Sequence, residues 1–282
     1  MNWKKTILWI VAVVITLSAA VYQRLTGPTY PKRVKVELNN KEYKFKLLRS
    51  HGGESDAPVE LTIDDENVSA VLHYKYYPEH ENEEWKNSEF MHEDGKMIAY
   101  LPNQPMAGKL MYYITLKSGD DIIDLEKEHP VVIRFKGEVP KYVLFPHIFF
   151  MFFAMLLANV AGLFALWKIP EFKKYTNITF VFLIIGGLIL GPFVQKFAFD
   201  EFWTGIPWGW DLTDNKTLFG FIFWLIAVLG NRKENNRPYL TVIAAIATLI
   251  IFSIPHSMFG SELDRTTGTV TQGVIQFLNL LI

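Results

Sequence analysis

The stretch VLFPHIFFMFFAMLLANVAGLFALW, residues 143–167, decides the class of this protein. It contains no aspartate, glutamate, lysine or arginine, and most of its side chains are aliphatic or aromatic. The hydrocarbon core of a bilayer is crossed by a helix of about 20 apolar residues. A run of this length and composition therefore predicts a transmembrane helix and an integral membrane protein.

Four more apolar runs give the same indication. One precedes this stretch at 6–23, and three follow it at 177–197, 217–230 and 239–256. The run 217–230 is short, but residues on either side can extend it. These runs predict a helical membrane bundle of five transmembrane helices. A last apolar segment, residues 270–282, is too short to span and is predicted to be an interfacial or re-entrant helix.

The first apolar run has two interpretations. Lys4 and Lys5 precede it, and the small residues SAA at 18–20 resemble the cleavage site of a secretory signal peptide. The run is long for a signal peptide, however, and Tyr22 follows the small residues closely. We therefore expect an uncleaved signal anchor.

The basic residues of the short loops predict the orientation, because cytoplasmic loops carry an excess of lysine and arginine. The N-terminus carries two lysines, and the loops after the second and fourth helices carry Lys168, Lys173, Lys174, Arg232, Lys233 and Arg237. With five spans, all three segments fall on one side. We expect a multi-pass protein of the cytoplasmic membrane with its N-terminus inside. Residues 24–141, 198–216 and the chain from about 257 then lie on the extracytoplasmic side.

An exported β-domain is predicted between the first two helices. Apolar and polar residues alternate on both sides of Asn39-Asn40, which is typical of a β-hairpin. Further alternating segments suit an antiparallel β-sandwich. The expected domains are a signal anchor and linker at 1–28, the β-sandwich at 29–140, and a four-helix membrane domain at 141–282.

One part of this β-domain resembles a known module. The run MIAYLPNQPMAGKLMYYITLKSGDD, residues 97–121, combines a strand, a proline- and glycine-containing turn, a second strand and a polar hairpin. It resembles the ends of fibronectin-type-III and immunoglobulin-like (Ig-like) modules, and the resemblance covers residues 59–127. It implies an Ig-like sandwich, but it implies little about function.

Composition excludes several kinds of site. The sequence has no cysteine, which excludes disulfides, thiolate metal sites and covalent c-type haem attachment. The formal net charge is −1, which gives no electrostatic argument for a nucleic-acid partner. No dinucleotide-binding, P-loop or zinc-protease motif is present. No nucleophile–base–orienter pattern is visible, so the sequence gives no basis for assigning an enzymatic reaction.

The segment FWTGIPWGWDLTDNK, residues 202–216, lies between two predicted helices on the extracytoplasmic side. Tryptophans often form belts at the membrane interface, which is the simplest interpretation of Trp203, Trp208 and Trp210. The interleaved glycines and proline indicate a compact, shaped loop instead. Asp214 or Thr213 is positioned to cap the helix that begins near Thr217, and we expect one of the two aspartates, Asp211 or Asp214, to have this role.

Two histidines are predicted at the depth of this loop. His147 lies at the outer end of the second helix and His256 at the outer end of the last, and each follows a proline. Ionisable residues near a membrane span indicate a functional site by default. Two neutral imidazoles at one depth have the chemistry to bind haem iron from opposite faces.

Residues 203–224, WTGIPWGWDLTDNKTLFGFIFW, resemble the tryptophan-rich "WWD" segment of the haem-handling membrane proteins of cytochrome c biogenesis. HSMFG at 256–260 is similar to a histidine-containing stretch that follows this segment in some members. Where the family segment continues with Pro-Lys-Glu, this chain has LTDN at 212–215. The resemblance implies haem held against Trp203, Trp208, Trp210 and Asp211, with His147 and His256 as axial ligands.

Two alternatives stay open. The first is a divalent-metal site without porphyrin, since histidine and carboxylate suit zinc, manganese or iron. Its candidate ligands are His147, His256, Asp200, Glu201, Asp211, Asp214, Glu262 and Asp264. The second is a non-catalytic envelope protein, anchored in the lipid bilayer, whose Ig-like domain binds another membrane or envelope protein.

Overall fold

The computed structural model describes residues 3–78, 83–255, 262–263, 265, 267–268 and 270–271. The chain divides into two compact units. The helical unit comprises residues 1–28, 139–261 and 272–282, and the β-unit comprises residues 29–138 and 262–271. The sequence placed 262–271 in the membrane domain, whereas the structure groups this segment with the β-unit. His256 and residues 272–282 of the predicted interfacial helix lie outside the described residues.

The helical unit contains five helical segments in the described part of the chain. They are α1 (Trp3–Thr26), α2 (Lys141–Leu166), the continuous run α3 (Phe172–Leu183), η1 (Ile184–Leu190) and α4 (Gly191–Phe199), then α5 (Leu212–Gly230) and α6 (Pro238–Ser253). Four of them, all except α6, are long and apolar enough to cross a membrane. At 1.5 Å per residue the 16 residues of α6 cover about 24 Å, less than the ~30 Å hydrocarbon core.

The third helical run is interrupted by a π-helical turn, η1. Pro192 follows directly and cannot donate the backbone hydrogen bond that a regular helix requires. Gly186 of η1 lies against α2, where an added Cβ would come within 2.9 Å of Phe150 and Met151, and Gly187 lies against α5, where an added Cβ would be 2.8 Å from Thr217. The turn therefore combines a proline break with a close helix–helix contact. Such π-turns often occur at functional sites.

Small side chains and polar pairs join the helices. Gly162 of α2 faces Ala245 of α6 so closely that an added Cβ would lie 2.5 Å from the alanine Cβ. The indole nitrogen of Trp224 donates to Thr248 at 2.7 Å, which links α5 to α6. Asn159 of α2 donates to Thr16 of α1 at 2.9 Å. Close approach of small residues and interhelical hydrogen bonds are typical of helices packed in lipid.

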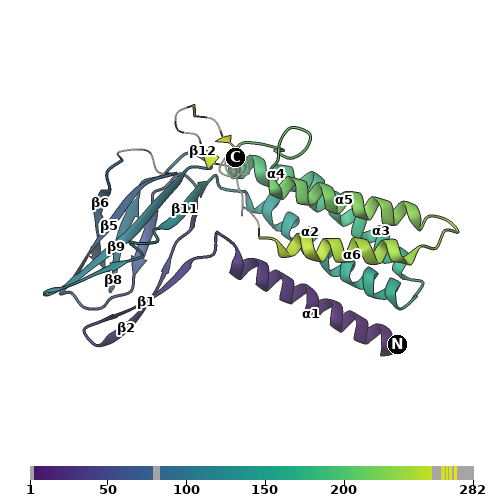
Figure 1. Ribbon diagram of the computed structural model, residues 1–282, viewed down its shortest axis with the longest axis horizontal. Helices are drawn as coiled ribbons and strands as arrows, with labels where there is room; N and C mark the ends of the chain where they lie inside the picture. Colours follow the sequence, from purple (N-terminus) through teal and green to yellow (C-terminus); the bar gives the residue numbers. More distant parts are fainter. Residues whose placement is uncertain are drawn as a thin grey trace. The chain divides into compact units, whose positions relative to one another are not determined.

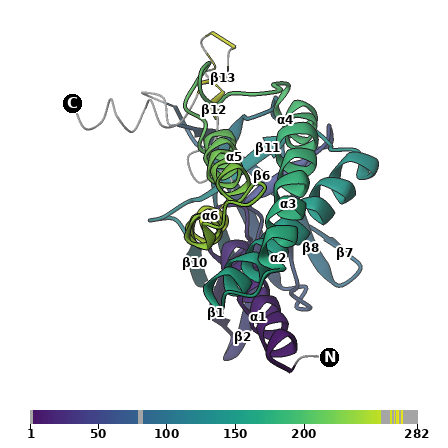
Figure 2. The same ribbon diagram turned by 90° about the vertical axis from the view of Figure 1, so that its right-hand side faces the viewer.

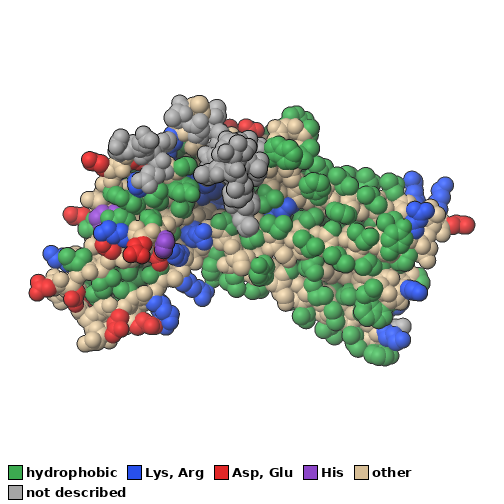
Figure 3. Space-filling model, in the orientation of Figure 1, with side chains coloured by type: hydrophobic (Ala, Val, Ile, Leu, Met, Phe, Trp, Pro, Cys, Tyr) green, Lys and Arg blue, Asp and Glu red, His purple; other side chains and the backbone are tan. Residues whose placement is uncertain are grey.

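The surface of the helical unit suits a bilayer. Figure 3 shows hydrophobic side chains over most of its visible face, with lysine and arginine gathered at one end. The three predicted basic segments lie together at that end: Lys5 pairs with Glu171 of the α2–α3 loop, and Lys173 donates to the Asn235 carbonyl of the α5–α6 loop at 2.7 Å. Figure 2 looks along the helices and shows them side by side. The protein is therefore a membrane-type helical bundle joined to a separate β-sheet unit.

The β-unit consists of a six-stranded sheet, a three-stranded sheet and two hairpins (Figure 1). The larger sheet has the order β3-β11-β9-β5-β6, with β10 also paired to β9, and the smaller has the order β4-β8-β7. The strands are β1 (Lys32–Leu38), β2 (Lys41–Leu47), β3 (Ser50–Gly52), β4 (Ala57–Leu61), β5 (Val68–Tyr77), β6 (Lys86–Glu89), β7 (Met91–Glu93), β8 (Lys96–Leu101), β9 (Lys109–Ser118), β10 (Asp121–Leu125), β11 (Val131–Lys136), β12 (Glu262–Leu263) and β13 (Val270–Thr271).

Local sequence explains much of this unit. Asn39 and Asn40 both adopt positive φ, 52° and 58°, which confirms the predicted hairpin between β1 and β2. Inward-facing apolar side chains from both sheets and from the β1–β2 hairpin form one core that includes Leu47, Leu101 and Tyr112. The larger sheet is mixed, because β3 pairs with β11 in parallel, whereas the sequence predicted antiparallel strands. The smaller sheet is antiparallel, as predicted.

Candidate functional site

The predicted Trp loop, residues 202–211, is held by the first turn of α5. Asp211 is the N-cap of this helix, and its carboxylate accepts hydrogen bonds from the backbone N–H groups of Thr213 at 2.8 Å and Asp214 at 3.1 Å. One of the two aspartates therefore caps the helix, as predicted, but the helix begins at Leu212 rather than near Thr217, so the cap is Asp211 and not Asp214 or Thr213. The carboxylate of Asp211 is therefore used within the fold.

Two residues in the first turn of α5, Asp214 and Asn215, fix the shape of the loop. Asp214 accepts a hydrogen bond from the Thr204 backbone at 2.6 Å, and Asn215 accepts one from the Ile206 backbone at 2.8 Å. Gly205 lies so close that an added Cβ would be 2.7 Å from Asp214 Cβ. Gln195 of α4 donates to the Thr204 hydroxyl at 2.7 Å. The loop is thus compact and shaped, as its glycines and proline predicted.

The three tryptophans do not share one environment. Trp203 is half-buried and donates to the Ile206 carbonyl at 3.1 Å. Trp208 and Trp210 are 79% and 61% exposed. This exposure suits an interfacial layer or a bound molecule that covers the two rings.

His147 points into the helical unit. Its Nδ1 lies 2.9 Å from the carbonyl oxygen of Gly186 in η1. A carbonyl oxygen only accepts, so Nδ1 carries the hydrogen and Nε2 of a neutral ring keeps its lone pair. A backbone carbonyl that holds Nδ1–H is the usual orienting contact of a metal-binding histidine. The π-helical turn thus orients the predicted ligand.

The structure does not bring together those of the other proposed metal ligands that it describes. Asp200 pairs with Lys196 at 2.8 Å, and the carboxylates of Asp211 and Asp214 bind the Trp loop and the start of α5. Among the described residues, no three histidine or acidic side chains form a group able to hold a metal ion. His256 and Asp264, and the side chain of Glu262, lie outside the description.

Sequence reasoning missed a pocket beside the first turns of α5. Lys216 of α5 is only 6% exposed and lines the pocket with Gln23 of α1. Its Nζ donates to the carbonyls of Ile254 at 3.0 Å and Pro255 at 3.4 Å, where α6 ends. The signal was present, because Lys216 directly precedes an uncharged apolar run, but the contact with α6 required the fold.

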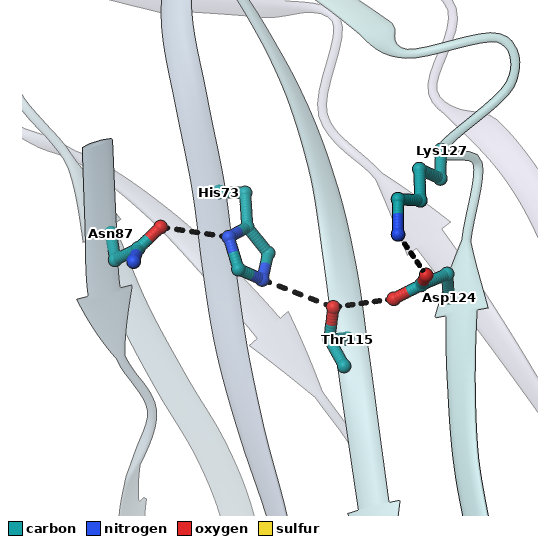
Figure 4. Close-up of polar contacts among 5 residues, drawn as sticks. All are labelled: His73, Asn87, Thr115, Asp124 and Lys127. Carbon is teal, nitrogen blue, oxygen red and sulfur yellow. Dashed lines mark hydrogen bonds and ion pairs between the residues drawn. The ribbon is translucent and has the colours of Figure 1, made fainter. Parts of the chain in front are cut away.

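A second polar cluster, on the β-unit, was also missed. Figure 4 shows a line of contacts across β6, β5, β9 and β10. Asn87 Oδ1 lies 2.7 Å from His73 Nδ1, the Thr115 hydroxyl lies 3.0 Å from His73 Nε2 and 2.6 Å from Asp124, and Lys127 pairs with Asp124 at 2.6 Å. Lys127 and then Thr115 hold the pKa of the Asp124 carboxyl below its usual range. The register His73↔Asn87 and Thr115↔Asp124 aligns these residues.

Aromatic rings extend this cluster on the same face of the sheet. The His73 imidazole stacks on Tyr113 with ring centroids 4.4 Å apart, and Trp85 meets Tyr113 edge-on at 4.8 Å. Lys75 lies over the Trp85 ring at 4.6 Å. Thr115 does not resemble a nucleophile activated by His73, because its short contact with a carboxylate draws the hydroxyl hydrogen away from the imidazole. The cluster is suited to binding rather than to hydrolysis.

Comparison with known proteins adds no relative to either site. No family model, no curated protein and no solved structure matches the chain. The functional proposal therefore rests on the chemistry of the described residues.

Proposed function

We propose that this protein is a multi-pass protein of the cytoplasmic membrane that binds haem at the Trp-loop end of its helical unit. In this proposal all five helices span, the N-terminus is inside, and the Trp loop and the β-unit, an Ig-like module, are extracytoplasmic. The supporting features are the apolar surface of the helices and the basic residues gathered at the opposite end of the helical unit. The role fits haem handling or cytochrome assembly.

The observation that carries the haem proposal is the orientation of His147. The contact from its Nδ1 to Gly186 leaves Nε2 as the nitrogen available to iron. The exposed rings of Trp208 and Trp210 supply aromatic surface for a porphyrin. Asp211 has a structural role as the N-cap, so we assign it to positioning the loop rather than to contacting the ligand.

An absorption spectrum tests this proposal. The full chain, purified in detergent after expression with excess haem, should show a Soret band and a reducible α-band. Both bands should be lost in His147→Ala and in His256→Ala, because each removes one axial ligand. Added imidazole should restore the bands in His147→Ala.

The matched control is His73→Ala, which removes a histidine of the β-unit and should leave the spectrum unchanged. A colourless wild-type protein that takes up no haem would refute haem binding. Elemental analysis of that colourless sample then tests the divalent-metal alternative, because a stoichiometric metal lost in His147→Ala would support it.

A second candidate function is partner binding by the β-unit. The observation in its favour is the aromatic and cationic face around His73, Trp85 and Tyr113, since aromatic residues are enriched at protein interfaces. A photo-crosslinking residue at Asn87, on this face, should trap a specific envelope protein in intact cells. The same residue at Glu93, on the smaller sheet, should not. Equal crosslinking at both positions would exclude this face as the interface.

A further inference from the structure

The pocket that contains Lys216 is nearly all apolar. Its wall includes Met151 of α2, Leu183 of α3 and Phe252 of α6, while Gln23 and Lys216 provide polar groups. Neither His147 nor any tryptophan of the Trp loop is among the residues that line it. The pocket is therefore separate from the proposed haem site, and binding in it does not depend on haem.

Lys216 is a buried cation whose described hydrogen-bond partners are neutral, and the Asp211 carboxylate that acts on it electrostatically is already engaged as the N-cap of α5. Its Nζ contacts the carbonyls of Ile254 and Pro255, which are the negative end of the α6 dipole. No carboxylate of the described residues lies within ion-pair distance of this ammonium. A buried charge is costly unless it is paired, and an ammonium has three N–H donors. The pocket wall thus presents a positive charge for which an anion is the natural complement.

The apolar part of the pocket continues along one face of α5. Gly220 follows Lys216 by four residues, so the two positions lie one above the other on the helix. An added Cβ at Gly220 would meet no atom within 4 Å, and Gly220 lines the pocket. A ligand whose charged group meets Lys216 therefore has open, apolar space directly beside that group.

We propose that this pocket binds an anionic amphiphile, an oxyanion carried on an alkyl chain, with the oxyanion at Lys216 and Gln23 and the first methylene groups beside Gly220. Each methylene group moved out of water contributes about 0.8 kcal/mol, so a short buried length of chain adds usefully to the charge interaction. A fatty-acid carboxylate and the phosphate of an anionic phospholipid share this chemistry. Both occur with alkyl chains in a membrane.

Substitutions at two positions, Gly220 and Lys216, test the apolar end and the charged end of the pocket. Gly220→Leu should fill the apolar part, because the Cβ position is open, and should weaken binding at least tenfold without loss of thermal stability. Lys216→Gln should weaken binding at least tenfold, whereas Lys216→Arg should keep it within a few-fold. Lys168→Gln is the matched control, since Lys168 is an exposed lysine at the opposite end of the helical unit.

The measurement is native mass spectrometry of the detergent-purified full chain, titrated separately with palmitate, phosphatidylglycerol and zwitterionic phosphatidylcholine. Retention of palmitate alone would identify a fatty-acid site, and retention of phosphatidylglycerol alone would identify a phospholipid site. Equal retention of phosphatidylcholine, or no effect of Gly220→Leu and Lys216→Gln, would overturn the proposal. The haem spectrum of Gly220→Leu should match the wild type, so the two proposals fail independently.

Discussion

Asp211 and Asp214 have different roles at the start of α5. Asp211 caps the helix, and Asp214 holds the backbone of the Trp loop. The capping role was predictable, because an aspartate just before an apolar helix is a common N-cap. The burial of Lys216 was not, because its carbonyl partners are 38 and 39 residues away in the sequence. No local pattern predicts which helix end will lie beside a given lysine.

The cap at Asp211 gives the first prediction. Asp211→Ala should reduce the free energy of unfolding by about 1 kcal/mol, because two backbone N–H groups lose their acceptor. Asp211→Asn should cost less, since asparagine is also a good N-cap. Thermal unfolding in detergent measures both changes. Equal losses for the two variants would show that the charge, rather than the cap, is what matters.

The carboxylate of Asp124 gives a pH-dependent prediction. Its pKa in the folded protein is held below the usual value, first by Lys127 and then by Thr115. A lowered folded pKa means that the stabilising contribution is present above the unfolded pKa of about 3.9 and is lost as the pH falls below it. The pair is exposed, so the contribution at neutral pH should be below about 1 kcal/mol.

Hydrogen-exchange protection of the β9–β10 amides measures this effect. Wild type should be better protected than Asp124→Asn at pH 6, and the difference should shrink progressively as the pH falls below about 4. Lys117→Gln, an exposed lysine on β9 without a described ion pair, is the control. A difference that grows toward acid pH would contradict the assignment.

At the scale of secondary-structure elements, the sequence predicted those features that depend on residues close together in the chain. The β1–β2 hairpin follows from Asn39-Asn40, whose side chains tolerate positive φ. The parallel pairing of β3 with β11 joins segments far apart in the chain, and no turn signal specifies it. The His73 cluster was missed for the same reason, because it depends on the register between strands. Pro192 is a local signal for a break in a helix, but it does not specify the π-helical form of η1.

The contact between α5 and α6 gives a prediction at this scale. Trp224 is fully buried and donates to Thr248. Thr248→Val keeps the branched shape but removes the acceptor, so it should destabilise the bundle by roughly 0.6 to 1.7 kcal/mol. When Thr248→Val is made in the Trp224→Phe variant, the loss of stability should be smaller, because the indole donor is already absent. Unfolding of the four proteins in detergent forms a double-mutant cycle, and a coupling of zero would show that the bond contributes nothing.

At the scale of the whole molecule, the membrane class was clear from the sequence because the apolar runs are long. The structure adds that the basic N-terminus and the two basic loops meet at one end of the helical unit. In the proposed topology this basic end is cytoplasmic, which requires α6, the shortest of the five helical segments, to cross the membrane.

Single-cysteine labelling tests the proposed membrane topology, which is the central claim, most directly, because the chain has no cysteine of its own. Four exposed residues are chosen for replacement by cysteine: Lys117 on β9, Glu201 beside the Trp loop, and Lys168 and Arg232 in the two basic loops. With a membrane-impermeant maleimide, Lys117→Cys and Glu201→Cys should be labelled on intact spheroplasts. Lys168→Cys and Arg232→Cys should be labelled only after the membrane is permeabilised. Labelling of either basic-loop position from outside, or protection of Glu201→Cys, would contradict the proposed arrangement.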